Sequence, residues 1–81
     1  MIRKFFVIAE GEGRLDIVSR ISMLFLQRHV DVESLKYLPM DGCRSRYEVC
    51  ALPHENSIRQ ILGQMEHIEG LDKIIVENEH E

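Results

Sequence analysis

The sequence predicts a single α+β domain in which four strands and two helices alternate in the order β-α-β-β-α-β. Three observations support this order: short β-branched and aromatic runs near both ends, two apolar patterns of helical spacing, and an Asp-Gly turn near the middle. Two βαβ halves joined by a hairpin form the ferredoxin-like arrangement, an antiparallel four-stranded sheet with both helices on one face. The other face and the edges of the sheet are then left to solvent or to a partner.

The first third of the chain contains a strand, a loop and a helix in this prediction. Residues 2–9 are apolar on both alternating faces, which is typical of a central strand. A glycine-bearing loop over 10–14 follows, and from 15–29 the apolar residues fall on one face of an amphipathic helix. Met23 and Leu26 point away from that face, so we expect them to belong to a partner surface.

A hairpin is predicted in the centre of the chain. The second strand, 30–38, ends before Pro39, because proline lacks the N–H that a sheet requires. Asp41 and Gly42 are a strong hairpin turn signal. In the third strand, 44–52, apolar and polar residues alternate, which indicates one buried and one exposed face.

The last third contains a helix and a strand. Apolar residues at helical spacing predict a helix over 56–68, which Gly70 stops. A final strand follows over 71–76, so the domain is expected to span 1–76. Residues 77–81 are predicted to be a short, frayed acidic tail.

Composition excludes several classes of protein. With 81 residues, 44% hydrophobic and 30% charged, the chain is too apolar for a disordered segment and so short that we expect oligomerisation. The net charge of -4 has the wrong sign for a nucleic-acid-binding protein. Two cysteines seven residues apart fit neither a disulfide scaffold nor a zinc site, and no signal peptide or membrane span is expected, so the predicted location is the cytoplasm.

No constellation of residues predicts catalysis. The four histidines show no metal-ligand spacing, and Cys50 has no base that the sequence can place beside it, so we expect no catalytic residue, no metal and no cofactor. An acylphosphatase-like enzyme would need a cationic loop, whereas E-G-E-G-R supplies one arginine together with two acids. The same loop opens a helix, however, and the free N–H groups of a helix start can bind a carboxylate such as that of an amino acid.

Residues 19–35, S-R-I-S-M-L-F-L-Q-R-H-V-D-V-E-S-L, resemble the pattern S-R-V-x-x-L-F-x-x-R-G-x-N-I-x-S-L. That pattern belongs to the ACT domain of the small regulatory subunit of acetolactate synthase. The identical positions are Ser19, Arg20, Leu24, Phe25, Arg28, Ser34 and Leu35. Residues 45–49 are similar to the third strand of the family, and 61–65, I-L-G-Q-M, to its I-x-K-Q-L helix.

The resemblance implies a non-catalytic regulatory subunit. Such a subunit pairs side by side with a second copy, docks on the catalytic subunit of acetolactate synthase, and binds a branched-chain amino acid between the two copies. The ligand lies against the loop after the first strand and against the start of the neighbour's second strand. On this chain those positions are Gly13, Arg14 and Leu15 in the loop, and Asp31 and Val32 on the facing strand.

Two departures from the family affect the expected effector site. The segment from Glu10 to Arg20 is two residues longer than the family motif, so either Gly13 or Asp16 stands at the position of the loop glycine. Asp31 replaces the asparagine of the family, and an ionised aspartate only accepts hydrogen bonds. Asp31 could hold a ligand ammonium group but would repel a nearby carboxylate. A free-standing amino-acid sensor that controls another enzyme or regulator is the alternative function.

Overall fold

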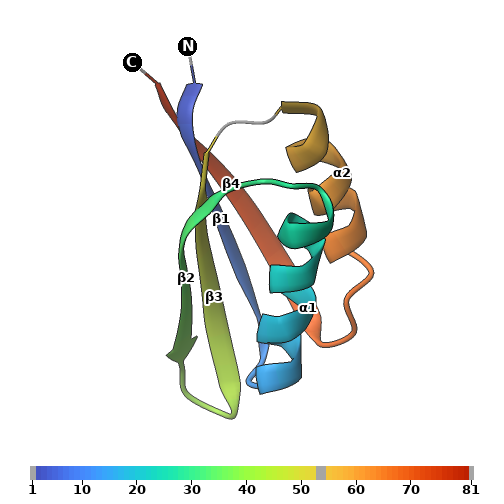
Figure 1. Cartoon of the computed structure of the whole chain (residues 1–81). Helices are drawn as coiled ribbons and strands as arrows, with labels where there is room; N and C mark the ends of the chain where they lie inside the picture. Colours follow the sequence, from blue (N-terminus) through green and yellow to red (C-terminus); the bar gives the residue numbers. More distant parts are fainter. Residues whose placement is uncertain (1, 53–54, 81) are drawn as a thin grey trace.

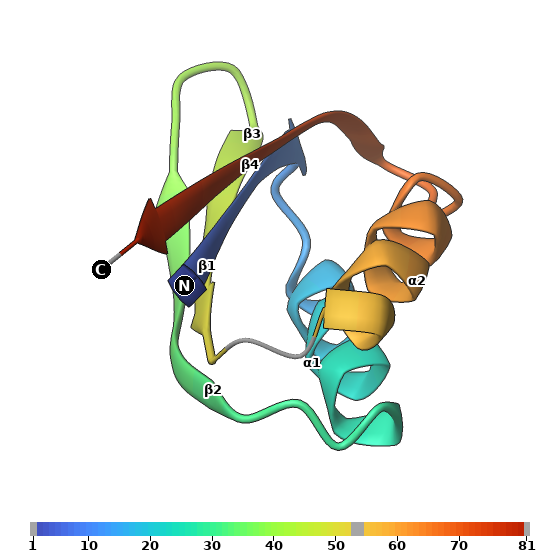
Figure 2. The same cartoon turned by 90° about the horizontal axis from the view of Figure 1, so that it is seen from above.

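The computed structural model describes residues 2–52 and 55–80. The elements are β1 (Ile2–Glu12), α1 (Leu15–Gln27), β2 (Val32–Pro39), β3 (Arg44–Ala51), α2 (Glu55–Met65) and β4 (Leu71–His80). The strands form one antiparallel sheet in the order β2-β3-β1-β4, and both helices pack on one face (Figures 1 and 2). The predicted ferredoxin-like fold is therefore confirmed.

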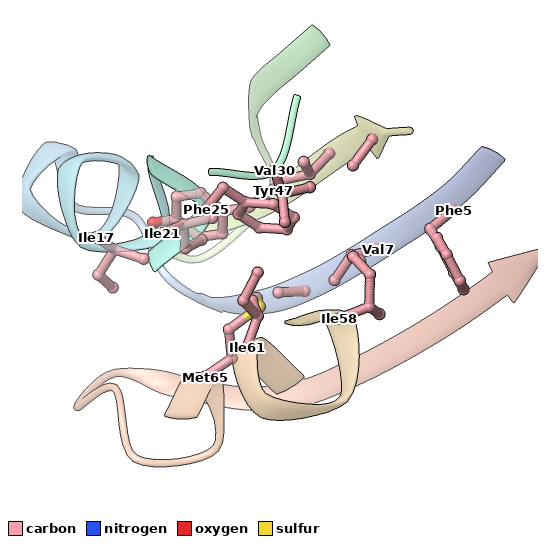
Figure 3. Close-up of a cluster of buried hydrophobic side chains, with 13 residues drawn as sticks. Phe5, Val7, Ile17, Ile21, Phe25, Val30, Tyr47, Ile58, Ile61 and Met65 are labelled. Carbon is pink, nitrogen blue, oxygen red and sulfur yellow. The ribbon is translucent and has the colours of Figure 1, made fainter. Parts of the chain in front are cut away.

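The core lies between the helices and the two central strands. In β1 and β3 alternate residues face the helices, as the sequence pattern of the third strand predicted. Figure 3 shows the inward side chains of both helices directed at these strands. The buried hydrophobic residues are Phe5, Val7, Ala9, Ile17, Ile21, Phe25, Val30, Tyr47, Val49, Ala51, Ile58, Ile61 and Met65. The other strand residues point to the opposite side of the sheet, which is an open face without helices.

β1 extends three residues further than predicted, to Glu12. Glu10, Gly11 and Glu12 pair with β3 instead of forming a loop, and Gly11 also pairs with Leu71 of β4. A side chain at Gly11 would place its Cβ 2.0 Å from the Gly70 carbonyl oxygen, so the backbones approach closely here. The glycine that suggested a loop in the sequence is the residue that allows the strand to continue.

β4 is also longer than predicted, and the expected frayed tail is wrong for 77–80. Glu77 pairs with Phe6 and Asn78 with Phe5, so the ladder with β1 continues to His80. The acidic composition and the terminal position of 77–81 predicted a frayed tail. The available partner strand outweighs this tendency to fray. Residue 81 lies outside the described residues.

The helix ends show how the chain turns back to the sheet. α1 ends at Gln27, and His29 adopts a left-handed φ of 56°. The Val30 N–H donates to the Phe25 carbonyl at 3.1 Å and the His29 N–H to the Leu26 carbonyl at 3.0 Å, which closes the helix. α2 ends at Met65, three residues earlier than predicted.

The hairpin between β2 and β3 is confirmed, but its two residues with positive φ come one position later than the Asp-Gly signal predicted. Gly42 and Cys43 both have positive φ, at 70° and 61°. The Met40 N–H donates to the Arg44 carbonyl at 2.8 Å and closes the loop. The left-handed conformation at Cys43 is uncommon for a residue with a side chain.

β2 and β4 are the two edges of the sheet. β2 is mostly exposed, with Leu35 and Tyr37 as its partly buried, inward residues. Within the described parts of the chain, neither helix is long and apolar enough to cross a membrane.

Candidate functional site

The connection between β1 and α1, which we call the β1–α1 loop (residues 12–15, with the last residue of β1 and the first of α1), is held by backbone carbonyls and one side chain of the surrounding elements. The Glu12 N–H donates to the Gly70 carbonyl at 2.8 Å, and the Gly13 N–H to the Cys43 carbonyl at 2.9 Å. The Arg14 N–H donates to the Tyr47 hydroxyl at 3.1 Å. Three successive amides therefore have three partners from different parts of the chain, and the loop is preformed.

Tyr47 of β3 is the main anchor of this loop. Its ring is fully buried, and its hydroxyl donates to the Glu12 carbonyl at 2.6 Å while it accepts from the Arg14 N–H. Burial raises the pKa of the Tyr47 phenol, so the group stays protonated and remains a donor. The alternation of the third strand was predicted, but this role of Tyr47 was not. The available signal was that a buried tyrosine hydroxyl needs a partner.

Arg14 is tied to two carboxylates. Its guanidinium contacts Asp16 through Nε at 2.9 Å and Nη2 at 2.7 Å, and Glu12 through Nη1 at 2.9 Å. Hydrogen bonds from Arg14 are the main cause that lowers the pKa of the Asp16 carboxyl well below its usual range. The charge of Arg14 is therefore already matched, and a ligand carboxylate would have to compete with both acids.

The remaining donors of the loop lie at the start of α1. The N–H groups of Leu15 and Asp16 belong to the first turn, where a helix has no acceptor of its own. Leu15 is 72% exposed, so its side chain is open to a second molecule. Backbone donors with a nearby apolar side chain can bind the carboxylate and side chain of a small amino acid.

A surface hollow of about 380 Å³ lies where the β1–α1 loop meets the hairpin turn. It is lined by Glu12, Gly13, Arg14, Gly42, Cys43 and Arg44. A Cβ at Gly13 would lie 2.7 Å from the Ser45 hydroxyl oxygen, so a larger residue here would force the Ser45 side chain to move. Arg44 forms a bidentate pair with Asp72 of β4, at 2.8 Å for both bonds, which fixes its guanidinium.

Within one chain, the two halves of the predicted effector site lie beside opposite ends of β3. Asp31 is exposed, and its carbonyl accepts the Leu52 N–H at 2.9 Å. Val32, which is also exposed, pairs with Ala51, whereas the β1–α1 loop lies beside the other end of β3. One chain therefore does not bring Asp31 and Val32 together with Gly13, Arg14 and Leu15.

Both residues of the predicted partner surface are exposed, but only one of them lines a groove. Met23 and Leu26 are both among the exposed large hydrophobic residues of α1. Met23 lines a groove of about 370 Å³ between α1 and α2, together with Leu24 of α1 and with Gln64 and Ile68 near the end of α2. Leu26 does not line this groove. Among the described residues, no group of three or more His, Cys, Asp or Glu side chains is placed to hold a metal ion.

No protein-family model matches the sequence, and no curated protein matches it significantly. The fold does resemble solved structures. The ACT domain from the GTP pyrophosphokinase of Chlorobium tepidum has a TM-score of 0.70 at 8% identity, over 94% of this chain and 99% of that chain. The small subunit of acetolactate synthase from Thermotoga maritima has a TM-score of 0.74 at 18% identity, over 93% of this chain and 47% of that chain.

The same fold also occurs outside these two proteins. The C-terminal domain of the MgtC protein from Mycobacterium tuberculosis has a TM-score of 0.80 at 6% identity, over 96% of this chain and 88% of that domain. Identities this low establish the fold alone. The chain has the fold of ACT domains, and its role is a separate question.

Proposed function

We propose that the chain is a non-catalytic regulatory subunit, an ACT-fold homodimer that docks on the catalytic subunit of acetolactate synthase, with a branched-chain amino acid as its candidate effector. One observation carries this proposal. Several residues that match the acetolactate synthase pattern, Ser19, Arg20 and Ser34, are exposed and so are not required by the core. Packing explains a match at Phe25, which is buried, but it does not explain matches at exposed polar positions.

The geometry of β2 supports the proposed pairing. β2 is an edge strand, and its outer side can pair with another strand. In an antiparallel pair of two β2 strands, the start of one lies beside the end of the other. The end of β2 is close to the β1–α1 loop, since the Tyr37 hydroxyl lies 3.3 Å from the Cβ position of Gly13. Pairing would therefore bring Asp31 of one copy toward Gly13 of the other.

The charges of the combined site favour a particular orientation of the effector. The carboxylate would bind the N–H groups of Leu15 and Asp16, since Arg14 is occupied by Glu12 and Asp16. The ammonium group would face Asp31 of the other copy, because an aspartate accepts hydrogen bonds from a cation. The exposed side chains of Leu15 and Val32 would contact the aliphatic part.

Binding to the synthase tests the proposal directly. The catalytic subunit of acetolactate synthase from the same organism would be mixed with the full chain, and complex formation and acetolactate production measured with and without valine, leucine and isoleucine. We expect a complex and a changed rate. A thermal-shift screen of the free chain against the twenty amino acids would accompany it, because a ligand at a hundredfold excess over Kd adds about 2.7 kcal/mol of stability.

The outcomes separate the two functions. Amino-acid binding by a chain that does not bind the synthase would support the free-standing sensor instead. A chain that binds neither the synthase nor any amino acid would contradict both functions. Asp31→Asn is the informative variant, because an amide restores the donor of the family pattern and should change amino-acid affinity without unfolding an exposed position.

A further inference from the structure

The sheet face without helices carries a hollow of about 160 Å³ with an apolar floor (Figure 2 shows both helices on the opposite face). Phe6 and Ile8 of β1 and Cys50 of β3 form this floor, and Phe6 lies opposite Cys50 in the strand register. An engineered apolar cavity of about 150 Å³ binds benzene, so this hollow can take an aliphatic body of about six carbons. Drug-sized ligands need about 300 Å³ or more, so the hollow fits a small metabolite.

Two unpaired opposite charges stand at the two sides of this hollow. Lys36 comes from β2 and Glu77 from β4, and both line it. Within the described parts of the chain, neither side chain has an ion pair or hydrogen bond. A ligand with one positive and one negative end could satisfy both.

The other charges around the hollow are already matched. Glu48, which also lines it, contacts Arg46 with its carboxylate 2.8 Å from Nε. Next to the floor, Glu33 binds Lys4 at 2.9 Å and accepts the Cys50 thiol at 3.6 Å. These pairs leave Lys36 as the available cation and Glu77 as the available anion.

The strand register sets the spacing of the two charges. Ser34, Cys50, Phe6 and Glu77 form one row across all four strands, and Lys36 follows Ser34 on the same face of β2. At about 4.8 Å between strands, the two ends of this row are about 14 Å apart at the backbone. The side chains shorten this distance, but they approach from opposite sides. A ligand that meets both must therefore be extended along the row.

We propose that this hollow binds a short, extended aliphatic zwitterion, with its carboxylate on Lys36 and the Ser34 hydroxyl, its ammonium group on Glu77, and its body on Phe6. An ω-amino acid or a small aliphatic dipeptide has this chemistry. An α-amino acid carries both charges on one carbon and spans less of the row. The site is separate from the β1–α1 loop and does not depend on the proposed function.

Titration followed by NMR tests the site. The isotope-labelled full chain would be titrated with ε-aminocaproate, and with caproate and hexylamine, which each lack one of the two charges. We expect saturable shifts of the amides of Ser34, Cys50, Phe6 and Glu77 with ε-aminocaproate. Each singly charged compound should bind about tenfold more weakly or worse, since each loses a charge-assisted contact.

Variants of the two charged residues test which residue contacts each end of the ligand. Lys36→Gln and Glu77→Gln should each lower affinity for ε-aminocaproate about tenfold. Lys73→Gln, at an exposed lysine of β4 outside the hollow, should leave the affinity unchanged. All three positions are exposed, so the amide spectrum of each variant should show an intact fold.

Three results would overturn the proposal. The first is the absence of saturable shifts at millimolar ε-aminocaproate. The second is a set of shifts centred on 12–15, which would place the zwitterion at the loop. The third is equal affinity for hexylamine or caproate, which would show that one of the two charges makes no contact. Binding to acetolactate synthase is not used as a readout, so failure of either proposal leaves the other intact.

Discussion

The Tyr47 hydroxyl connects a buried strand to the start of α1. Tyr47→Phe keeps the ring but removes the donor to the Glu12 carbonyl and the acceptor for the Arg14 N–H. We expect a loss of about 1–3 kcal/mol in the free energy of unfolding, because two backbone groups lose their partner. Urea unfolding would measure it, and amide exchange at Arg14 should accelerate by a larger factor than at Val49. Equal acceleration at both residues would contradict a role as loop anchor.

The same hydroxyl predicts a pH dependence at alkaline pH. The pKa of Tyr47 is raised by burial, so the folded state holds this proton more tightly than the unfolded state. The contribution of this proton to the free energy of unfolding is therefore fully present below the usual tyrosine pKa. It is lost as the pH rises through the higher, folded-state pKa. Unfolding midpoints across this range should fall more steeply for the natural chain than for Tyr47→Phe.

His29 stands in a conformation that suits glycine. Its φ is 56°, and the family pattern quoted for residues 19–35 has glycine at this position. His29→Gly should raise the free energy of unfolding by about 1 kcal/mol, because the left-handed region costs a residue with a Cβ about that much. His29→Ala is the matched control, since it also removes the imidazole but keeps the Cβ that the left-handed region disfavours. Thermal unfolding that ranks the control above His29→Gly would refute this explanation.

At the scale of elements, the end of β4 gives the clearest test. Deletion of 77–81 should lower the free energy of unfolding by roughly 1–3 kcal/mol, because Glu77 and Asn78 then no longer pair with β1. Chemical unfolding of the shortened chain beside the full one measures this loss. An unchanged midpoint would mean that the ladder beyond Val76 contributes nothing to stability.

The elements also show what periodicity can and cannot predict. The apolar spacing of α1 and the alternation of β3 predicted both elements and their buried faces, because burial imposes these patterns directly. The ends of β1 and β4 were missed, because they depend on pairing partners far along the chain. Gly11 is the clearest case, since only its approach to Gly70 explains why it belongs in a strand.

The candidate site was predictable to a smaller extent. The sequence located the loop and the strand start through a resemblance, but it did not show that Glu12 and Asp16 occupy Arg14. Both acids are only two positions from Arg14 in the sequence, but which charges meet depends on the backbone geometry where β1 turns into α1. The two charges of the open sheet face without a partner among the described residues, Lys36 and Glu77, were missed because only the strand register places them on the two sides of one hollow.

For the whole molecule, the ion pairs predict sensitivity to acid. Hydrogen bonds from their basic partners lower the pKa of Asp16, Glu33 and Asp72. Carboxyls with a lowered folded-state pKa stabilise the fold above their usual range, and this stability is lost as the pH falls through that range and below it. Urea midpoints should therefore decrease from pH 7 to pH 3, and less so in high salt, because these groups are exposed. A midpoint that is constant with pH would contradict the prediction.

β1 and β4 are antiparallel neighbours, and Ile2 pairs with His80 (Figure 1 shows the start of β1 beside the end of β4). The β1–α1 loop lies at the far end of these strands. A fluorescent reporter, an affinity handle or a second protein joined to either end would therefore project away from the loop. Because Ile2 and His80 are cross-strand neighbours, a short peptide that joins β4 to β1 would allow the chain to be reopened within the hairpin turn with the same sheet.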